Sequence, residues 1–183
     1  NVRLPHAANV LKAIKVLKKE DQNFEMYVML GAWIDCKNAW TEAPLNHNEE
    51  SEYNASEIAR AIELANEYPD IVKIIAVGNE AMVKWATAYY VEPHIILKWV
   101  KHLQNLKQKG DLNPQVWITS SDNFDSWGGG ETQYHTAELN ELIKAVDYLS
   151  IHTYPMHDTH YNPVFWGVLS KEESLSNREK IDH

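Results

Sequence analysis

Glu80 follows an apolar segment, and a carboxylate at such a position costs free energy of hydration. It follows the apolar run Ile71–Val77, with only Gly78 and Asn79 between them. Placing a carboxylate next to a buried strand costs hydration, so its presence indicates a role in proton transfer or ligand binding. Gly78 would let the backbone bend or approach a ligand closely. The alternative is a solvated turn residue, or an acid favoured by the dipole at the start of a helix.

Polar and aromatic side chains also follow three other apolar segments. They are Trp33 and Asp35, Asp122 and Asn123, and His152 and Tyr154, with Trp127 in the loop beyond Asn123. The chain holds seven Trp and nine Tyr against three Phe, so its aromatic side chains mostly combine a flat apolar face with a polar tip. At strand ends such rings can stack on sugars, and elsewhere they pack in the core. For Trp127, a mobile stacking platform and ordinary loop packing both stay open.

The elements that position these residues follow from the apolar pattern. Four segments are expected to be strands: Met26–Ile34, Ile71–Val77, Gln115–Thr119 and Asp147–Thr153. The first two are nearly continuous apolar runs, typical of parallel strands covered on both faces. Helical patterns precede and separate the strands, so the order predicts an α/β fold with a parallel sheet. Periodicity leaves both an open doubly wound sheet and a closed barrel open, and the polar segments after the strands indicate a site at their carboxyl ends.

The helices carry signals of their own. Apolar residues recur at helical spacing in four segments: Val10, Leu11, Ile14 and Leu17; Ile58, Ala61, Ile62 and Ala65; Ile96, Trp99, Val100, Leu103 and Leu106; and Leu139, Leu142 and Ile143. Ser56 is expected to cap the second helix. Pro93 suits the first position of the third helix, and Gly110 suits its end. The polar tail at residues 171–180 could begin one more helix.

These strand ends resemble a known family. The segment IAVGNEAM, which contains Glu80, is similar to the fourth-strand signature of glycoside hydrolase family 17, the β-1,3-glucanases and related glucanosyltransferases. MLGAWID resembles the third strand of that family, WITSSDN its fifth and VDYLSIHTYP its sixth. The resemblance spans most of residues 8 to 167 in the order of the family. VGNE alone is moderately specific, but four segments in register make a strong signal.

The resemblance implies a partial (β/α)8 TIM barrel and retaining hydrolysis of β-1,3-glucan such as laminarin. Glu80 would match the catalytic acid/base, and Asn79 would match the Asn that binds the sugar 2-hydroxyl. Tyr154 falls where related barrels place a Tyr that contacts the nucleophile. The remaining expected substrate-binding residues are Trp33, Asp35, Asp122, Asn123, Trp127 and His152. The parent enzyme would be secreted or exposed at the cell surface, and the reaction needs no cofactor.

The chain also departs from the family. The family nucleophile is a second Glu after the seventh strand, and none of Asp35, Asp122, Asp125 and Asp158 matches that position. The 183 residues fall short of the roughly 250 of a full barrel. We therefore interpret residues 1–183 as a single partial barrel domain, truncated at both ends and inactive alone. Its open sheet edges would favour self-association. A β-1,3-glucanosyltransferase and a non-catalytic glycan-binding fragment stay as alternatives.

Composition excludes other classes of partner. The formal net charge of −9 argues against a nucleic-acid partner, because phosphate binding needs a basic surface. Cys36, as the one cysteine, excludes an internal disulfide. No apolar run reaches membrane-spanning length. The spacing of His135, His152, His157 and His160 fits no compact metal-binding motif, so no metal site is expected.

Overall fold

The computed structural model describes residues 2–130 and 132–154. The chain divides into two compact units, Asn1–Ile151 and His152–His183. Almost all of the described residues belong to the first unit, whose fold is given below. The expectation of one domain over residues 1–183 stays a prediction, because most of the second unit lies outside the described residues.

The elements of the chain alternate between helices and strands. In order they are α1 (Pro5–Glu20), β1 (Val28–Ala32), β2 (Cys36–Lys37), β3 (Asn46–Glu50), α2 (Tyr53–Glu67), β4 (Val72–Asn79), α3 (Pro93–Lys109), β5 (Trp117–Asn123), the short helical turns η1 (Asp125–Gly129) and η2 (Thr132–Tyr134), α4 (Ala137–Ala145) and β6 (Ser150–His152). The four predicted strands are therefore present, as are helices in the four predicted segments. The further helix expected at residues 171–180 lies outside the described residues.

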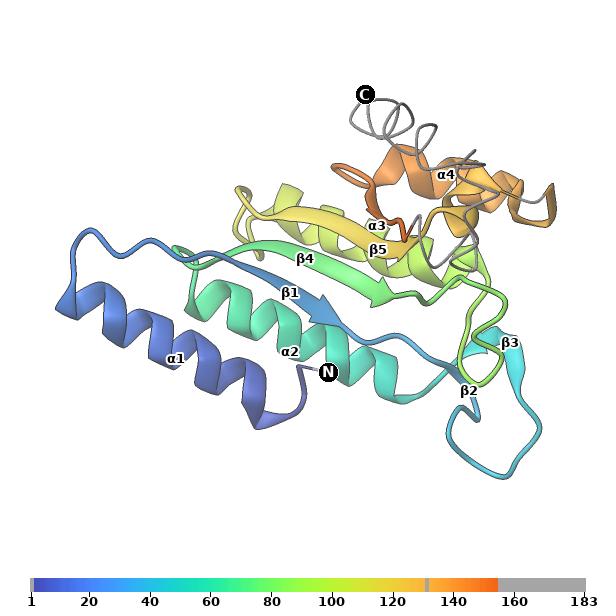
Figure 1. Cartoon of the computed structure of the whole chain (residues 1–183), viewed down its shortest axis with the longest axis horizontal. Coiled ribbons are helices and arrows are strands. Elements are labelled where there is room, and N and C mark those ends of the chain that lie inside the picture. The colour runs from blue at the N-terminus through green and yellow to red at the C-terminus, as the bar shows by residue number, and fades with distance from the viewer. Residues whose placement is uncertain (1, 131, 155–183) are drawn as a thin grey trace, which may run out of the picture. The chain divides into compact units, whose positions relative to one another are not determined.

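The strands form a sheet in the order β1-β4-β5-β6, and β4 pairs in parallel with both β1 and β5. This confirms the predicted parallel α/β fold. Figure 1 shows β1, β4 and β5 side by side, with β1 and β4 pointing toward the end of the sheet near β2 and β3. The outer strands of this sheet are β1 and β6. Self-association through them stays a prediction.

The two faces of the sheet differ in burial. Leu30, Ile75 and Ile118 lie in one row across β1, β4 and β5, and all three are buried in one core cluster with residues from α1 to α4. The next row holds Met29 and Trp117, which are 48% and 56% exposed. Side chains alternate between faces along a strand, so the helices pack on one face of the sheet.

Helix boundaries follow local chemistry in most places. Pro93 begins α3, and Gly110 ends it with φ +82°, a left-handed conformation that glycine adopts without strain. Both predictions are confirmed. The prediction that Ser56 caps α2 is wrong, because the helix already begins at Tyr53 and the Ser56 hydroxyl donates to the Tyr53 carbonyl at 2.8 Å.

Helical spacing in α1 did not identify its buried face completely. Leu11 and Ile14 are buried, but Val10 and Leu17 are 53% and 43% exposed. The apolar stripe of this helix is therefore narrower than its sequence suggests. No helix among residues 2–130 and 132–154 is long and apolar enough to span a membrane.

The antiparallel pair β2 and β3 was not predicted from the sequence. β2 has only two residues, and β3 reads NHNEE, with no apolar residue to show an alternating pattern. This pair extends the segment between β1 and α2 beyond the carboxyl end of the sheet. It forms one side of one of the two cavities described below.

Candidate active site

Glu80 lies directly after β4, at the carboxyl end of the sheet, and is half-buried. Its backbone N–H donates to the carbonyl of Ser121 on β5 at 2.8 Å, which joins the two strand ends. The φ of Glu80 is +47°, in the left-handed region that residues other than glycine rarely adopt. Strain of this kind is retained where the surrounding structure enforces it, most often at functional sites. The predicted position of Glu80 at this edge is confirmed.

The turn before Glu80 requires a glycine. Gly78 has φ +82°, and a Cβ there would lie 2.7 Å from the Cβ of Ala81. No side chain fits at that distance without moving the backbone. Gly78 is thus needed for the bend that turns Glu80 out of the strand, as the sequence suggested. Asn79, the last residue of β4, is exposed beside it and is paired in register with Ser121.

Asp122 forms a hydrogen bond that holds the loop after Glu80 in place. Its side chain is fully buried and accepts hydrogen bonds from the backbone N–H groups of Met82 at 2.7 Å and Asn123 at 2.8 Å. Burial raises its pKa to about 6, and the negative charge of Glu80 adds to that rise. With no exposed surface, Asp122 holds the loop in place and does not line a cleft. This corrects the expectation that it contacts substrate.

Trp33 and Asp35 follow β1 and meet a residue that the sequence did not single out, Tyr89. The rings of Trp33 and Tyr89 have centroids 5.3 Å apart, and the Trp40 ring stacks on Tyr89 with centroids 5.5 Å apart. The Trp33 indole N–H donates to the Asp35 carboxylate. The backbone N–H of Cys36 donates to the Tyr89 carbonyl at 3.0 Å, which ties the segment after β1 to the loop after Glu80.

Electrostatics link this aromatic cluster to Glu80. Burial raises the pKa of the Tyr89 hydroxyl first, and the negative charges of Glu80, Asp122 and Asp35 raise it further. The Tyr89 hydroxyl therefore interacts electrostatically with all three carboxylates. Burial also raises the pKa of Asp35, against the hydrogen bonds that it accepts from the Trp33 and Trp40 indoles. The signal that could have identified Tyr89 and Trp40 is their aromatic type in loops beyond strand ends, where sequence alone cannot pair them.

Asn123 and Trp127 each form a hydrogen bond with the protein backbone. The Asn123 side-chain oxygen accepts from the backbone N–H of Asp125, the first residue of the turn η1, at 2.9 Å. Trp127 is 6% exposed, and its indole N–H donates to the Ser150 carbonyl at 3.0 Å. Of the two alternatives for Trp127, the structure therefore supports packing of the side chain within the protein. It is not available in this conformation as a stacking platform.

His152 and Tyr154 belong to the second compact unit and contact each other. Their rings lie 6.3 Å apart, edge to face, and Tyr154 is 53% exposed. Their roles as substrate-binding residues stay predictions. His157, His160 and Asp158 lie outside the described residues. Within the described part of the chain, no group of His, Cys, Asp and Glu is arranged to hold a metal ion.

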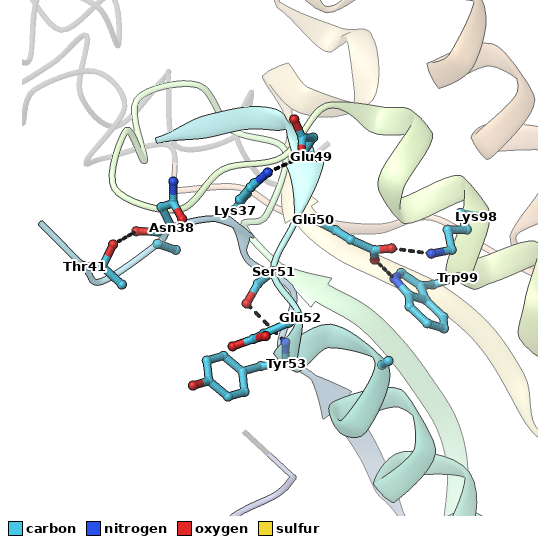
Figure 2. A pocket seen from close by; sticks show the side chains of 12 residues that line it. Lys37, Asn38, Thr41, Glu49, Glu50, Ser51, Glu52, Tyr53, Lys98 and Trp99 are labelled. Carbon is cyan, nitrogen blue, oxygen red and sulfur yellow. Dashed lines mark hydrogen bonds and ion pairs between the residues drawn. The ribbon is translucent and has the colours of Figure 1, made fainter. Parts of the chain in front are cut away.

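Two cavities adjoin the aromatic cluster. One has a volume of about 540 Å³ and is lined by Arg3, Trp33, Asp35, Ala39, Trp40, Thr41 and Tyr53. The other, of about 530 Å³, lies between the β2–β3 pair, the start of α2 and α3 (Figure 2). The two share Ala39, Thr41 and Tyr53 as a common wall, and Glu80 lines neither. They form a continuous indented surface beside the strand ends.

Models of protein families and curated proteins gave no match to this chain. A solved structure does match. The chain is similar to an endo-laminarinase from Formosa Hel1_33_131. The identity is 71% and the TM-score 0.90, and the match covers 100% of this chain and 46% of that one. The chain thus spans about half the length of the laminarinase that it resembles, and the two share an α/β fold with a parallel sheet.

Proposed function

We propose that this chain is part of a β-1,3-glucan hydrolase of the laminarinase type, with a retaining mechanism and Glu80 as its acid/base. The observation that carries the proposal is the similarity to an endo-laminarinase at 71% identity over the whole chain. The position of Glu80 supports it, because this carboxylate is half-buried at the carboxyl end of a parallel strand, where α/β enzymes place their sites. The resemblance of four strand ends to glycoside hydrolase family 17 points the same way.

We further propose that the parent protein is a (β/α)8 barrel, with β1, β4, β5 and β6 as four of its strands. Two features support this. Neighbouring strands of the sheet follow one another along the chain, apart from the separate β2–β3 pair. All four helices contribute to the core cluster that contains Leu30, Ile75 and Ile118. In a doubly wound sheet, helices cover both faces, whereas in a barrel they lie outside the closed sheet.

In this mechanism Glu80 first donates its proton to the leaving glycosidic oxygen, while a second carboxylate attacks the anomeric carbon. Glu80 then takes a proton from the water that hydrolyses the glycosyl-enzyme. Asn79 would hold the 2-hydroxyl of the sugar, an interaction that strengthens in the transition state. The exposed position of Asn79 next to Glu80 suits this role.

Neither Asp35 nor Asp122 suits the role of nucleophile. Asp122 is fully buried and accepts two backbone hydrogen bonds, and Asp35 is 7% exposed and accepts from indole N–H groups. Both carboxylates are thus engaged in supporting the site. We expect the nucleophile to be a Glu that follows a later strand of the parent enzyme. The chain alone should then bind laminarin without releasing reducing sugar.

The test is Glu80→Gln in the full-length enzyme, with laminarin as substrate and reducing ends as readout. Loss of the acid/base should lower kcat by about a hundredfold or more. The matched control is Glu63→Gln on α2, where the glutamate is 62% exposed and pairs with Arg60. Turnover of Glu80→Gln near that of the control would refute the assignment.

A further inference from the structure

We propose that the cavity between Trp33, Trp40 and Tyr53, named here the aromatic cavity, binds a glucosyl ring away from the bond that is cleaved. We also infer that Asp35 is a positioning residue that sets the two indole rings of this cavity. The proposal rests on the glucan specificity proposed above and names where a distant sugar of that glucan would bind. Glu80 does not line the cavity, so the bound ring would not be the one undergoing reaction.

The Trp40 ring face is available and its orientation is fixed. Trp40 is 65% exposed and lines the cavity together with Tyr53, whose ring has the Arg3 guanidinium 4.9 Å from its centre. Trp40 lies nearly parallel to Tyr89, with an interplanar angle of 23°, and Tyr89 in turn packs against Trp33. An exposed, stacked ring of this kind offers a flat apolar face at low entropic cost. Pyranose rings have apolar C–H faces that match it.

The backbone at Trp40 indicates that its position is enforced. Its φ is +64°, a conformation that is strained for a bulky residue. Trp40 would relax to a common conformation unless its contacts with Tyr89 and Asp35 held it there. Observed strain at an exposed aromatic residue supports a functional role for its placement.

Asp35 connects these rings. Its carboxylate accepts the indole N–H of Trp33, and a hydrogen bond from the Trp40 side chain acts on the same carboxylate. The main chain of Asp35 is fixed by Asn54, whose side chain accepts from the Asp35 N–H at 3.0 Å and donates to its carbonyl at 2.9 Å. One buried carboxylate thus sets the orientation of two tryptophans from a rigid position.

The neighbouring cavity is less suited to a neutral sugar. There Lys98 lies 4.5 Å from the centre of the Trp99 ring, and the Trp99 indole N–H donates to Glu50 at 2.6 Å. Figure 2 shows Glu50 joined to both residues and Lys37 joined to Glu49. Among the residues that line this cavity, Trp99 and Tyr53 carry aromatic rings, and Tyr53 also lines the aromatic cavity. Two ion pairs lie in its walls, whereas the aromatic cavity has the rings of Trp33, Trp40 and Tyr53, with Arg3 over the Tyr53 ring.

The aromatic cavity is joined to the loop after Glu80 through Tyr89. Tyr89 contacts both tryptophans, and its carbonyl accepts from the Cys36 N–H at 3.0 Å. The proposal places the reacting bond of the glucan at Glu80 and a distant sugar in the cavity. This geometry predicts a contribution to binding from sugars remote from the cleaved bond.

The first experiment is calorimetric titration of the full-length enzyme, inactivated by Glu80→Gln, with laminarihexaose. Trp40→Ala should weaken binding about tenfold or more, which corresponds to about 1.4 kcal/mol. Trp40→Phe, which keeps a ring face, should bind more tightly than Trp40→Ala. The control is Tyr27→Ala, which removes an aromatic ring that is 54% exposed just before β1, at the other end of the sheet, and should leave affinity unchanged.

The outcomes separate the subsite from the function on which it depends. Equal affinity of the full-length Glu80→Gln enzyme with and without Trp40→Ala would overturn the subsite and leave the proposed hydrolase intact. If the full-length Glu80→Gln enzyme bound no laminarihexaose, both the glucan specificity and the subsite would be wrong. In the full-length enzyme, Trp40→Ala should raise KM and leave kcat nearly unchanged, because the contact is the same in ground and transition states.

The role of Asp35 has its own test. Asp35→Ala should weaken laminarihexaose binding as Trp40→Ala does, with a changed near-ultraviolet circular dichroism spectrum from the released indoles. Asp35→Asn keeps a side-chain oxygen that accepts an N–H and should restore most of the affinity and the spectrum. Unchanged binding by a folded Asp35→Ala enzyme would show that Asp35 does not position the rings.

Discussion

Replacing Asp122 with Asn should change the dependence of stability on pH. The carboxylate is fully buried below the Glu80 loop, and burial raises its pKa from 3.8 to about 6. Because the folded chain then holds this proton more tightly than the unfolded chain, the stabilisation is fully present below about pH 3.8. It is lost as the pH rises through about 6. A rise in pKa of this size corresponds to about 3 kcal/mol.

Asparagine does not titrate, so Asp122→Asn lacks this pH-dependent part. Its amide nitrogen cannot accept, and the loss of one of the two backbone hydrogen bonds adds a cost of about 1–3 kcal/mol that is independent of pH. The difference in unfolding free energy, unaltered chain minus variant, should therefore fall by about 3 kcal/mol between roughly pH 3.5 and pH 7. Other titrating groups are common to both proteins and cancel in the difference.

The assay is urea unfolding followed by tryptophan fluorescence at a series of pH values. Asp111→Asn serves as the control, because Asp111 is exposed and the substitution should leave the pH dependence of stability nearly unaltered. A difference for Asp122→Asn that stays flat within about 1 kcal/mol over this range would refute the reasoning. It would mean that Asp122 is either hydrated in solution or paired more strongly than its backbone contacts indicate.

Two further substitutions test the support of the site by the same unfolding measurement. Glu57 is 1% exposed and accepts from Arg3 at 2.9 Å and from the Trp33 backbone N–H at 3.1 Å, so Glu57→Ala should cost about 3–5 kcal/mol; a loss below about 1 kcal/mol would show that these donors find water instead. Gly78→Ala should destabilise the chain by about 1–3 kcal/mol, since φ is +82° and the added Cβ would lie 2.7 Å from Ala81. Gly31→Ala is its control and should be nearly neutral, because nothing lies within 4 Å of a Cβ there; equal losses for the two would exclude backbone strain as the cause.

Local sequence patterns were sufficient to predict the repeating elements. The apolar run Ile71–Val77 corresponds to a strand because a short continuous apolar run is typical of a strand in the core of a parallel sheet. Pro93 and Gly110 marked the ends of α3 because fixed and left-handed φ values are properties of single residues. The placement of Glu80 at the carboxyl end of the sheet follows from these, since the residue after a parallel strand must lie at that edge.

Contacts between distant segments could not be predicted in this way. Asp122 and Trp127 had the residue types of a cleft, but one is buried below Met82 and the other packs on Ser150. The cluster of Trp33 and Tyr89 likewise joins residues far apart in the chain. Spacing along a chain reports which face of an element is apolar, whereas burial of a loop side chain depends on which other loop packs over it.

The amino-acid sequence by itself determined the order of helices and strands, the edge of the sheet at which Glu80 lies, and the likeness of that edge to a glucanase family. Only the tertiary structure decided which side chains at that edge face solvent and which support the loops. It also assembled the aromatic cavity, because Arg3, Trp40 and Tyr53, which line it, come from separate segments of the chain. The physical reason is that secondary structure depends on local backbone and side-chain preferences, whereas a binding surface depends on how the loops pack against one another.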